Sequence, residues 1–224
     1  MTMYPYSRSN PIENEKLIIN RMVASSLRPK VVLDAFAGDG TSTHIFARYA
    51  EQIIAIEKDR QCANGFLNNA HNRKVTLIIN SNLRILPLLA PRAFELIDLD
   101  PCGSCYDQIE LCANLLSDRG ILLLSSGEIQ RVVRGLSLSR FAESRNYKGR
   151  KAVLWAESVW IPYVTRLLFG QGCKVRPIHF FTSPVLIRVV FAAENAQFCL
   201  KALNKRPKYL SWFRQVLPGF SPDV

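Results

Sequence analysis

An apolar run ends in a glycine-rich turn at Val31-Val32-Leu33-Asp34-Ala35-Phe36-Ala37-Gly38-Asp39-Gly40. A continuous apolar run is typical of a strand that is covered on both faces. Gly38 and Gly40 carry no β-carbon, so the backbone can turn sharply there and approach a ligand. A helical pattern follows over residues 41–50. The stretch therefore predicts the first strand–turn–helix unit of a parallel sheet.

The same alternation of strands and helices continues downstream. We expect strands at residues 53–57, 75–79, 94–99 and 121–125, and helices at 60–71, 105–117 and 153–169. Two more strand patterns, 175–182 and 185–192, are separated only by Ser183-Pro184, which predicts a hairpin. A dinucleotide dehydrogenase would need a second mononucleotide-binding half instead. We expect a Rossmann-like α/β fold with a mostly parallel seven-stranded sheet, a C-terminal antiparallel hairpin, and helices on both faces.

The chain contains 224 residues, which fits one domain. A helix is expected from Ser9-Asn10-Pro11 to Leu27, because proline favours the first helical turn. We therefore divide residues 1–224 into an N-terminal helical segment (1–30), a Rossmann-like core (31–192) and a basic tail (193–224).

Charge and cysteine content suggest the partner and the compartment. A formal net charge of +11 favours polyanions, and nucleic acid is the commonest of them. Only Cys102 and Cys105 among six cysteines form a CxxC pair, without the further ligands of a zinc site, so we expect no metal. The start, Met1 to Pro5, lacks the pattern of a signal peptide, and no apolar stretch is long enough to span a bilayer. These features predict a cytoplasmic protein with reduced thiols.

The strand ends suggest a site for a nucleotide-like cofactor. Ligands of open parallel sheets bind at the carboxyl ends of the strands, and helix N-termini attract carboxylates there. Glu57 ends the second strand 23 residues after Asp34, the position of an acid that binds ribose hydroxyls, with Asp59 as a competitor. Alternatively, the two glycines only shape a turn. The C-terminal hairpin resembles the end of the Rossmann-like methyltransferase fold, which implies S-adenosylmethionine as the cofactor. The candidate residues for binding it are Asp34, Ala37, Gly38, Gly40, Glu57, Lys58, Asn82 and Asp98.

An acidic turn ends the fourth strand, at Asp98-Leu99-Asp100-Pro101. Methylation of a base amino group requires that its nitrogen lone pair be freed from the ring and aimed at the methyl donor. A carboxylate and a backbone carbonyl can accept the two amino hydrogens and so orient that lone pair. We assign these roles to Asp100 and to the carbonyl of Pro101, with Asp98 on the same face of the strand.

The motif Asp98-Leu99-Asp100-Pro101-Cys102-Gly103-Ser104 resembles the Asp-x-Asp-Pro-aromatic-Gly-Ser motif of tRNA guanine N2-dimethyltransferases. The segments Asn10-Pro11 with Asn14, Gly120 to Leu123, and Tyr147-Lys148-Gly149-Arg150 are also similar to that family, over roughly residues 10–192. The resemblance implies a class I S-adenosylmethionine-dependent methyltransferase that acts on guanine N2 in tRNA or another RNA. Cys102 replaces the family's aromatic residue, and Tyr106 is the candidate for stacking on the base.

Other chemistries remain open. Pro101-Cys102 also resembles the Pro-Cys dipeptide of cytosine C5-methyltransferases, in which a thiolate attacks the ring. RNA members of that class usually carry a second cysteine after the fifth strand, where this chain has Ser125-Ser126-Gly127-Glu128. A DNA amino-methyltransferase and a non-catalytic nucleic-acid-binding protein of the same fold are further alternatives.

A basic segment follows the fifth strand, where it should overhang the site. Aromatic Phe141 and Tyr147 lie within it and could stack on bases, although a solvated basic loop is the simpler interpretation. A second basic stretch, Lys201 to Arg214, lies in the tail. The candidate nucleic-acid contacts are Arg131, Arg134, Arg140, Arg145, Lys148, Arg150 and Lys151, together with Tyr106.

Overall fold

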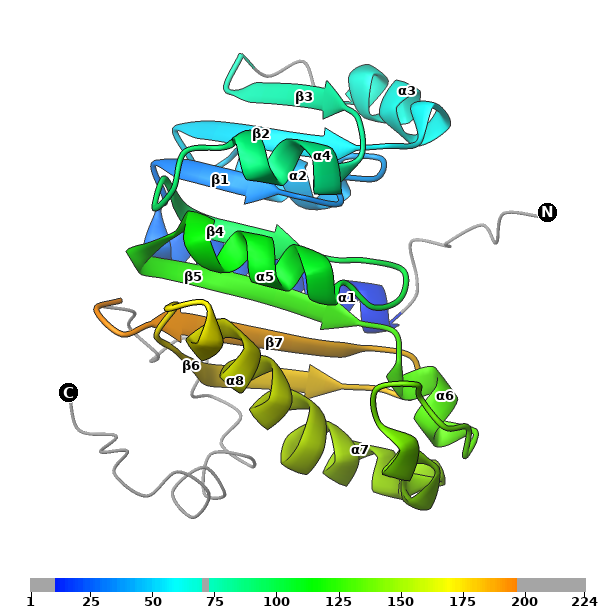
Figure 1. Cartoon of the computed structure of the whole chain (residues 1–224). Coiled ribbons are helices and arrows are strands. Elements are labelled where there is room, and N and C mark those ends of the chain that lie inside the picture. Colours follow the sequence, from blue (N-terminus) through cyan, green and yellow to red (C-terminus); the bar gives the residue numbers. More distant parts are fainter. Residues whose placement is uncertain (1–10, 70–72, 197–224) are drawn as a thin grey trace.

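Seven strands form one sheet in the computed structural model, which describes residues 11–69 and 73–196 (Figure 1). Their order is β3-β2-β1-β4-β5-β7-β6. Strands β1 to β5 are parallel, and β7 runs antiparallel to both β5 and β6. The expected sheet with its C-terminal hairpin is therefore confirmed. The strands are β1 (Val31–Asp34), β2 (Gln52–Glu57), β3 (Val75–Ile79), β4 (Phe94–Leu99), β5 (Leu116–Ser126), β6 (Val175–Thr182) and β7 (Ile187–Ala193).

Helices cover both faces of this sheet, as expected. Helices α1 and α2 pack together behind it, whereas α5 packs against α4 and α8 in front (Figure 1). The α-helices are α1 (Pro11–Leu27), α2 (Thr41–Phe46), α3 (Arg60–Asn69), α4 (Asn82–Ile85), α5 (Tyr106–Leu115), α6 (Ile129–Val133), α7 (Ala152–Trp155) and α8 (Ile161–Gly170). Short 3-10 turns are η1 (Leu86–Leu88), η2 (Ala142–Tyr147) and η3 (Gly149–Lys151), and η4 (Ala156–Trp160) is a π-helical turn.

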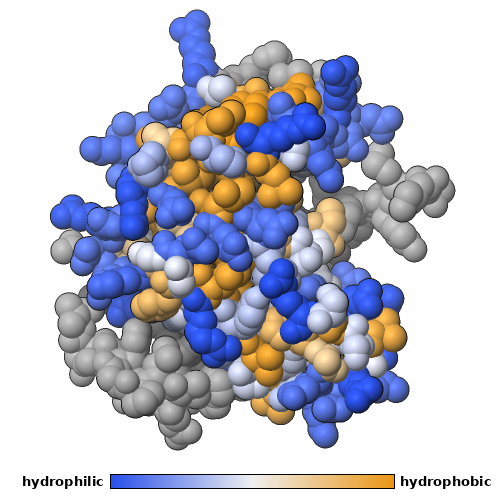
Figure 2. Space-filling view, viewed as in Figure 1, coloured by the Kyte–Doolittle hydropathy of each residue, from blue (hydrophilic) through white to orange (hydrophobic). Residues whose placement is uncertain are grey.

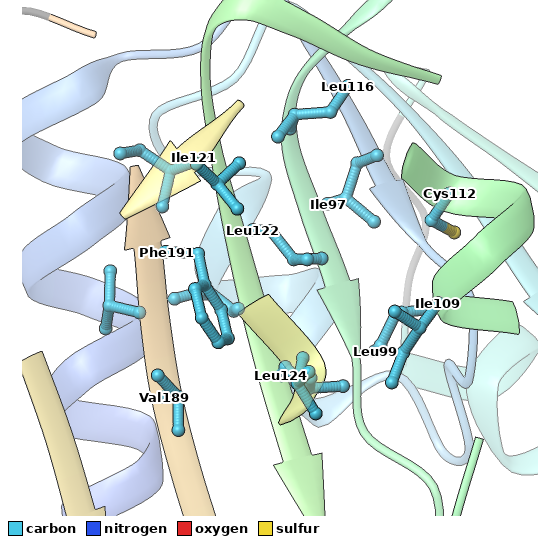
Figure 3. Packing of buried hydrophobic residues seen from close by; sticks show 14 of the residues in the cluster. Ile97, Leu99, Ile109, Cys112, Leu116, Ile121, Leu122, Leu124, Val189 and Phe191 are labelled. Atoms are coloured by element: carbon cyan, nitrogen blue, oxygen red, sulfur yellow. The ribbon is translucent and has the colours of Figure 1, made fainter. Parts of the chain in front are cut away.

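The core lies between the central strands and their helices. Figure 3 shows Ile97 and Leu99 of β4 facing Ile109 and Cys112 of α5. Leu122 of β5 is likewise buried. Nearly every residue of β4, β5 and β7 that lies in the middle of the sheet is buried, which explains why these strands are continuous apolar runs.

The short helix α4 leaves apolar side chains exposed at the β3 edge. Ile79, Leu83 and Leu88 are 44%, 43% and 78% exposed, and Figure 2 shows a hydrophobic area in this part of the molecule. Hydrophilic side chains cover much of the remaining surface in that view.

Several element boundaries differ from expectation. Strand β5 begins at Leu116 rather than residue 121, because Leu116 pairs with Phe94 before the register shifts. Gly120 permits this irregular start, since a β-carbon there would lie 2.7 Å from the Leu116 side chain. The helix expected at 153–169 is divided into α7, η4 and α8. Helix α2 ends at Phe46 rather than at residue 50.

Some predictions fall outside the described residues. These are the helix start at Ser9-Asn10, the last part of the helix at 60–71, and the basic stretch from Lys201 to Arg214. Within residues 11–69 and 73–196, no helix is both long enough and apolar enough to cross a membrane.

Candidate active site

Two buried carboxylates meet where the strand order reverses, between β1 and β4. Asp34 and Asp98 are register partners on these strands and are 1% and 0% exposed. Thr43 of α2 donates a hydrogen bond of 2.6 Å to Asp34 Oδ2. Asp34 Oδ1 and Asp98 Oδ2 are buried without a hydrogen-bond partner. Such atoms are costly unless a donor satisfies them, so this point of the sheet is suited to a bound cationic or N–H group.

The positive charge of Arg188 on β7 compensates the negative charge of these acids. The sequence analysis did not identify this residue. Its guanidinium is fully buried and donates through Nη1 to Asp98 Oδ1 at 2.7 Å and to Ser125 Oγ at 2.9 Å. Nη2 donates to Asn20 Oδ1 on α1. Because β7 runs antiparallel, its beginning lies beside the carboxyl end of β5, where Ser125 pairs with Arg188. A sequence signal existed: a lone arginine in a fully apolar central strand must be buried and paired.

Asp100 directly follows the last residue of β4 and contacts α1. Lys16 Nζ is 2.7 Å from Asp100 Oδ2, and the two side chains are 13% and 16% exposed. Burial alone would raise the pKa of Asp100, but Lys16 and Arg188 outweigh burial and hold that pKa below its usual range. A hydrogen bond with Ser125 acts in the same direction. Asp100 is therefore an ionised, positioned carboxylate at the predicted catalytic turn.

The end of β5 braces the turn after Asp100. The Gly127 N–H donates to the Gly103 carbonyl at 3.1 Å, and a β-carbon on Gly127 would lie 3.1 Å from the Cys102 carbonyl. Pro101 is buried, whereas the Cys102 side chain is exposed. These two constraints fix the backbone path of the loop that follows Asp100.

The glycine turn has the backbone that its sequence predicts. Gly38 and Gly40 have φ angles of 55° and 86°, in the left-handed region that favours glycine. A β-carbon on Gly40 would also lie 2.7 Å from the Phe66 ring. Ala37 is buried, and its N–H bonds the Ile56 carbonyl at 3.0 Å.

Glu57 supports this turn from the end of β2. Its Oε2 accepts from the Gly38 N–H at 2.8 Å and its Oε1 from the Asp59 N–H at 2.7 Å. A carboxylate has about four acceptor positions, so room remains for ribose hydroxyls, and that role stays a prediction. Lys58 beside it is exposed.

The start of α2 differs from expectation. The Thr41 N–H, which we expected to face a ligand carboxylate, already donates to Asp39 Oδ1 at 3.1 Å. Asn82 connects two elements: its Nδ2 donates to the Ala35 carbonyl, and its Oδ1 accepts from Gln108 Nε2, both at 3.1 Å. Asn82, a candidate cofactor-binding residue, is thus held between the end of β1 and the first turn of α5.

Tyr106 belongs to a polar and aromatic cluster beside the turn. It is 8% exposed, and its hydroxyl donates to Glu128 Oε2. Trp160 Nε1 donates to the Tyr106 oxygen at 3.1 Å, and the Arg140 guanidinium lies 4.5 Å from the ring centroid. Stacking of Tyr106 on a base therefore stays a prediction, because Arg140 covers this ring here. Trp160 and Trp155 are both fully buried in the core.

The basic segment after β5 exposes its charges. All seven predicted arginine and lysine contacts are solvent-exposed, on α6 and on the turns that lead to α7. Arg140 also donates to the Tyr163 hydroxyl at 2.9 Å, so it connects this segment to the aromatic cluster. In the part of the chain that the structure describes, no group of three or more metal-ligating side chains occurs.

The family model described as Conserved hypothetical protein 95 matches residues 15–130, just over half of the chain. The chain belongs to this family. The matched region includes the glycine turn, the acidic turn and all of β1 to β5. Membership in the Conserved hypothetical protein 95 family thus covers the strand ends that carry the two central acids.

Comparison with individual proteins extends this result. A tRNA (guanine(26)-N(2))-dimethyltransferase of Saccharolobus islandicus is 25% identical over 206 residues, 88% of this chain and 54% of that protein. The chain therefore spans about half the length of the curated relatives it matches. Trm1 from Pyrococcus horikoshii, solved with S-adenosyl-L-methionine, matches at 16% identity and a TM-score of 0.61 over 86% of this chain and 58% of that one.

A further solved structure, TYW2 from M. jannaschii in complex with AdoMet, matches at 20% identity and a TM-score of 0.56, over 84% of this chain and 77% of that one. These likenesses show the fold. This member of the Conserved hypothetical protein 95 family has the Rossmann-like class I methyltransferase fold.

The buried acid pair predicts a dependence of stability on pH. Burial, together with the neighbouring Asp98, raises the pKa of Asp34 to about 7 from 3.8. Between about pH 4 and pH 7 the folded protein then holds a proton that the unfolded chain has released, so stability falls as pH rises through this window. The loss amounts to at most roughly 4 kcal/mol, since one pKa unit corresponds to about 1.4 kcal/mol.

Urea unfolding of the wild-type protein and of Asp34→Asn between pH 5 and pH 8 tests this prediction. The neutral amide can keep the Thr43 hydrogen bond and also donate to Asp98, so the variant should lose most of the slope. Asp118→Asn, at an exposed site, should keep it. The same slope in Asp34→Asn and wild type would show that Asp34 is ionised throughout.

Proposed function

We propose that this protein is an S-adenosylmethionine-dependent methyltransferase that acts on an exocyclic base amino group, with guanine N2 in tRNA or another RNA as the first substrate to test. The observation that carries the proposal is the ionised Asp100, which is fixed in the Asp-Pro turn at the switch point, beside the β1 glycine turn. This is where an open parallel sheet binds its ligands.

The chain's own residues fit the cofactor. The unpartnered oxygens of Asp34 and Asp98 are suited to its ammonium group, and the path of Gly38 and Gly40 lets the backbone approach it. Glu57 and Asn82 would face its ribose and adenine. When bound, S-adenosylmethionine supplies an electrophilic methyl group, so that the amino nitrogen gains an N–C bond, the sulfonium C–S bond breaks with its electrons left on sulfur, and a proton leaves the nitrogen.

Asp100 and the Pro101 carbonyl would accept the hydrogens of the target amino group. These contacts turn the nitrogen lone pair out of conjugation with the ring and stabilise the positive charge that develops on nitrogen. Asp100 suits this role because the neighbouring cations keep it ionised. The bracing of the turn by Gly127 keeps the acceptors in place before substrate arrives.

The names of the relatives support the substrate class. A tRNA guanine N2-dimethyltransferase matches most of this chain, and two structural neighbours were solved with the same methyl donor. The net charge of +11 agrees with an RNA substrate. A cytoplasmic location is part of the proposal, supported by the free thiols at all five described cysteines.

The decisive experiment measures methyl transfer from labelled S-adenosylmethionine to tRNA, ribosomal RNA and DNA, followed by nucleoside mass spectrometry. Label in N2-methylguanosine would support the proposal. Label in 5-methylcytosine would instead identify Cys102, the exposed thiol of the turn, as the nucleophile. Cofactor binding without transfer to any pool would favour a non-catalytic protein of this fold.

The exposed basic segment is the proposed RNA contact. Reversing two of its charges, with Arg145→Glu and Lys148→Glu, should weaken tRNA binding and lower the slope of log K against log salt by roughly 1 to 2, because each lost phosphate contact removes about 0.7 to 0.9. Binding titrations over a salt series measure both effects. Arg119→Glu with Lys174→Glu makes the same charge change at exposed sites by the amino ends of β5 and β6, at the opposite end of the strands. Equal effects of the two pairs would contradict this contact.

A further inference from the structure

Helix α1 presents two polar side chains to the acidic strand ends. Lys16 and Asn20 are four residues apart, so they lie on the same face of the helix. Lys16 reaches Asp100 in the turn after β4, and Asn20 accepts from Arg188 of β7. Asn20 Nδ2 also donates to Ser42 Oγ at 3.1 Å, which ties the helix to the start of α2. The helix is therefore fastened to three separate elements around the site.

Among the residues that the structure describes, two cations act on the charge of Asp100. Lys16 on α1 and Arg188 on β7 are the cations that act on its charge, and Lys16 is the one in direct contact. Asp98 of β4 and Asp34 of β1 are the neighbouring acids. Since Arg188 is already bound to Asp98, Ser125 and Asn20, Lys16 is the partner that sets the orientation of Asp100.

We propose that Lys16 is a positioning residue for methyl transfer: its ammonium holds the Asp100 carboxylate by Oδ2 and turns it toward the target amino group. This inference rests on the proposed function. It assigns a task to Lys16 on α1, a residue that lies outside the motifs described in the sequence analysis.

The contact with Lys16 leaves Asp100 able to accept a hydrogen bond from the substrate. A carboxylate offers about four acceptor positions, so the bond from Lys16 and the one from Ser125 leave room for an amino hydrogen of the substrate. An ammonium also favours the charged form of the acid, which is the form that accepts hydrogen bonds. Because both side chains are more than four-fifths buried, the pair is shielded from solvent and holds a narrow range of geometries.

The test compares Lys16→Met and Lys16→Arg with the wild-type enzyme, and uses Lys174→Met as an exposed control. Lys16→Met should lower kcat by roughly 10- to 100-fold, the range typical of residues that orient a reacting group without contacting the substrate themselves. The KM for the cofactor should not change. The acid limb of the pH profile of kcat/KM should move to higher pH, because the Asp100 pKa rises when the ammonium is removed. Lys16→Arg should recover part of kcat, and Lys174→Met should match wild type.

Two outcomes would overturn the inference in distinguishable ways. If the wild type transfers methyl groups and Lys16→Met keeps both its kcat and its acid limb, Lys16 has no role and the proposed function stands. If the wild type methylates no nucleic acid, both are wrong. Denaturant unfolding of Lys16→Met at each pH gives the folded fraction, and rates corrected for that fraction show the position of the limb even for a partly unstable variant. Carbon-13 titration of the aspartate carboxyls provides a second readout, in which Lys16→Met should raise the Asp100 pKa.

Discussion

Asp100→Ala should lower kcat for methyl transfer by roughly 10²- to 10³-fold, the loss seen when one preorganised group facing developing charge is removed. The carboxylate accepts an amino hydrogen and stabilises positive charge on nitrogen, and the side chain of alanine does neither. Cofactor affinity should change little, since the oxygens assigned to the cofactor belong to Asp34 and Asp98. Single-turnover kinetics and cofactor titration separate the two effects.

Two variants serve as comparisons for Asp100→Ala. Asp118→Ala removes an exposed acid on the same sheet and should leave kcat near that of the wild type. Cys102→Ser should retain measurable turnover, whereas its complete loss, with Asp100→Ala still active, would assign the reaction to the thiol and refute amino methylation.

Arg188→Met should destabilise the protein by about 3 to 5 kcal/mol, the usual cost of removing one partner of a buried ion pair. Methionine fills a similar volume but leaves Asp98 buried without its cation and Asn20 and Ser125 without their donor. Since folded domains are stable by only about 5 to 15 kcal/mol, a large share of the stability would be lost. Denaturant unfolding at neutral pH gives the free energy directly.

The double variant Arg188→Met with Asp98→Asn isolates the ion pair. Removing both charges should recover part of the stability, because the uncompensated carboxylate is the main cost. Arg166→Met, at an exposed position of α8, should change stability by less than about 0.5 kcal/mol. A cost for Arg188→Met as small as that of Arg166→Met would show that the buried pair contributes nothing.

Patterns in the sequence alone predict the sheet, the glycine turn and the positions of Asp34, Asp98 and Asp100. These features depend on local patterns: apolar runs of strand length, glycines with a left-handed backbone, and acids at or just after the carboxyl ends of buried strands. In a parallel sheet all such strand ends lie at one edge, so the local pattern is enough to bring them together.

The partners that hold those acids come from long-range packing. Lys16 lies 84 residues from Asp100, and Arg188 lies 90 residues from Asp98 and 168 from Asn20. No local period links such positions. They meet because β7 enters the sheet antiparallel beside β5 and because α1 packs behind the strand ends, and burial then forces each charge to find a partner.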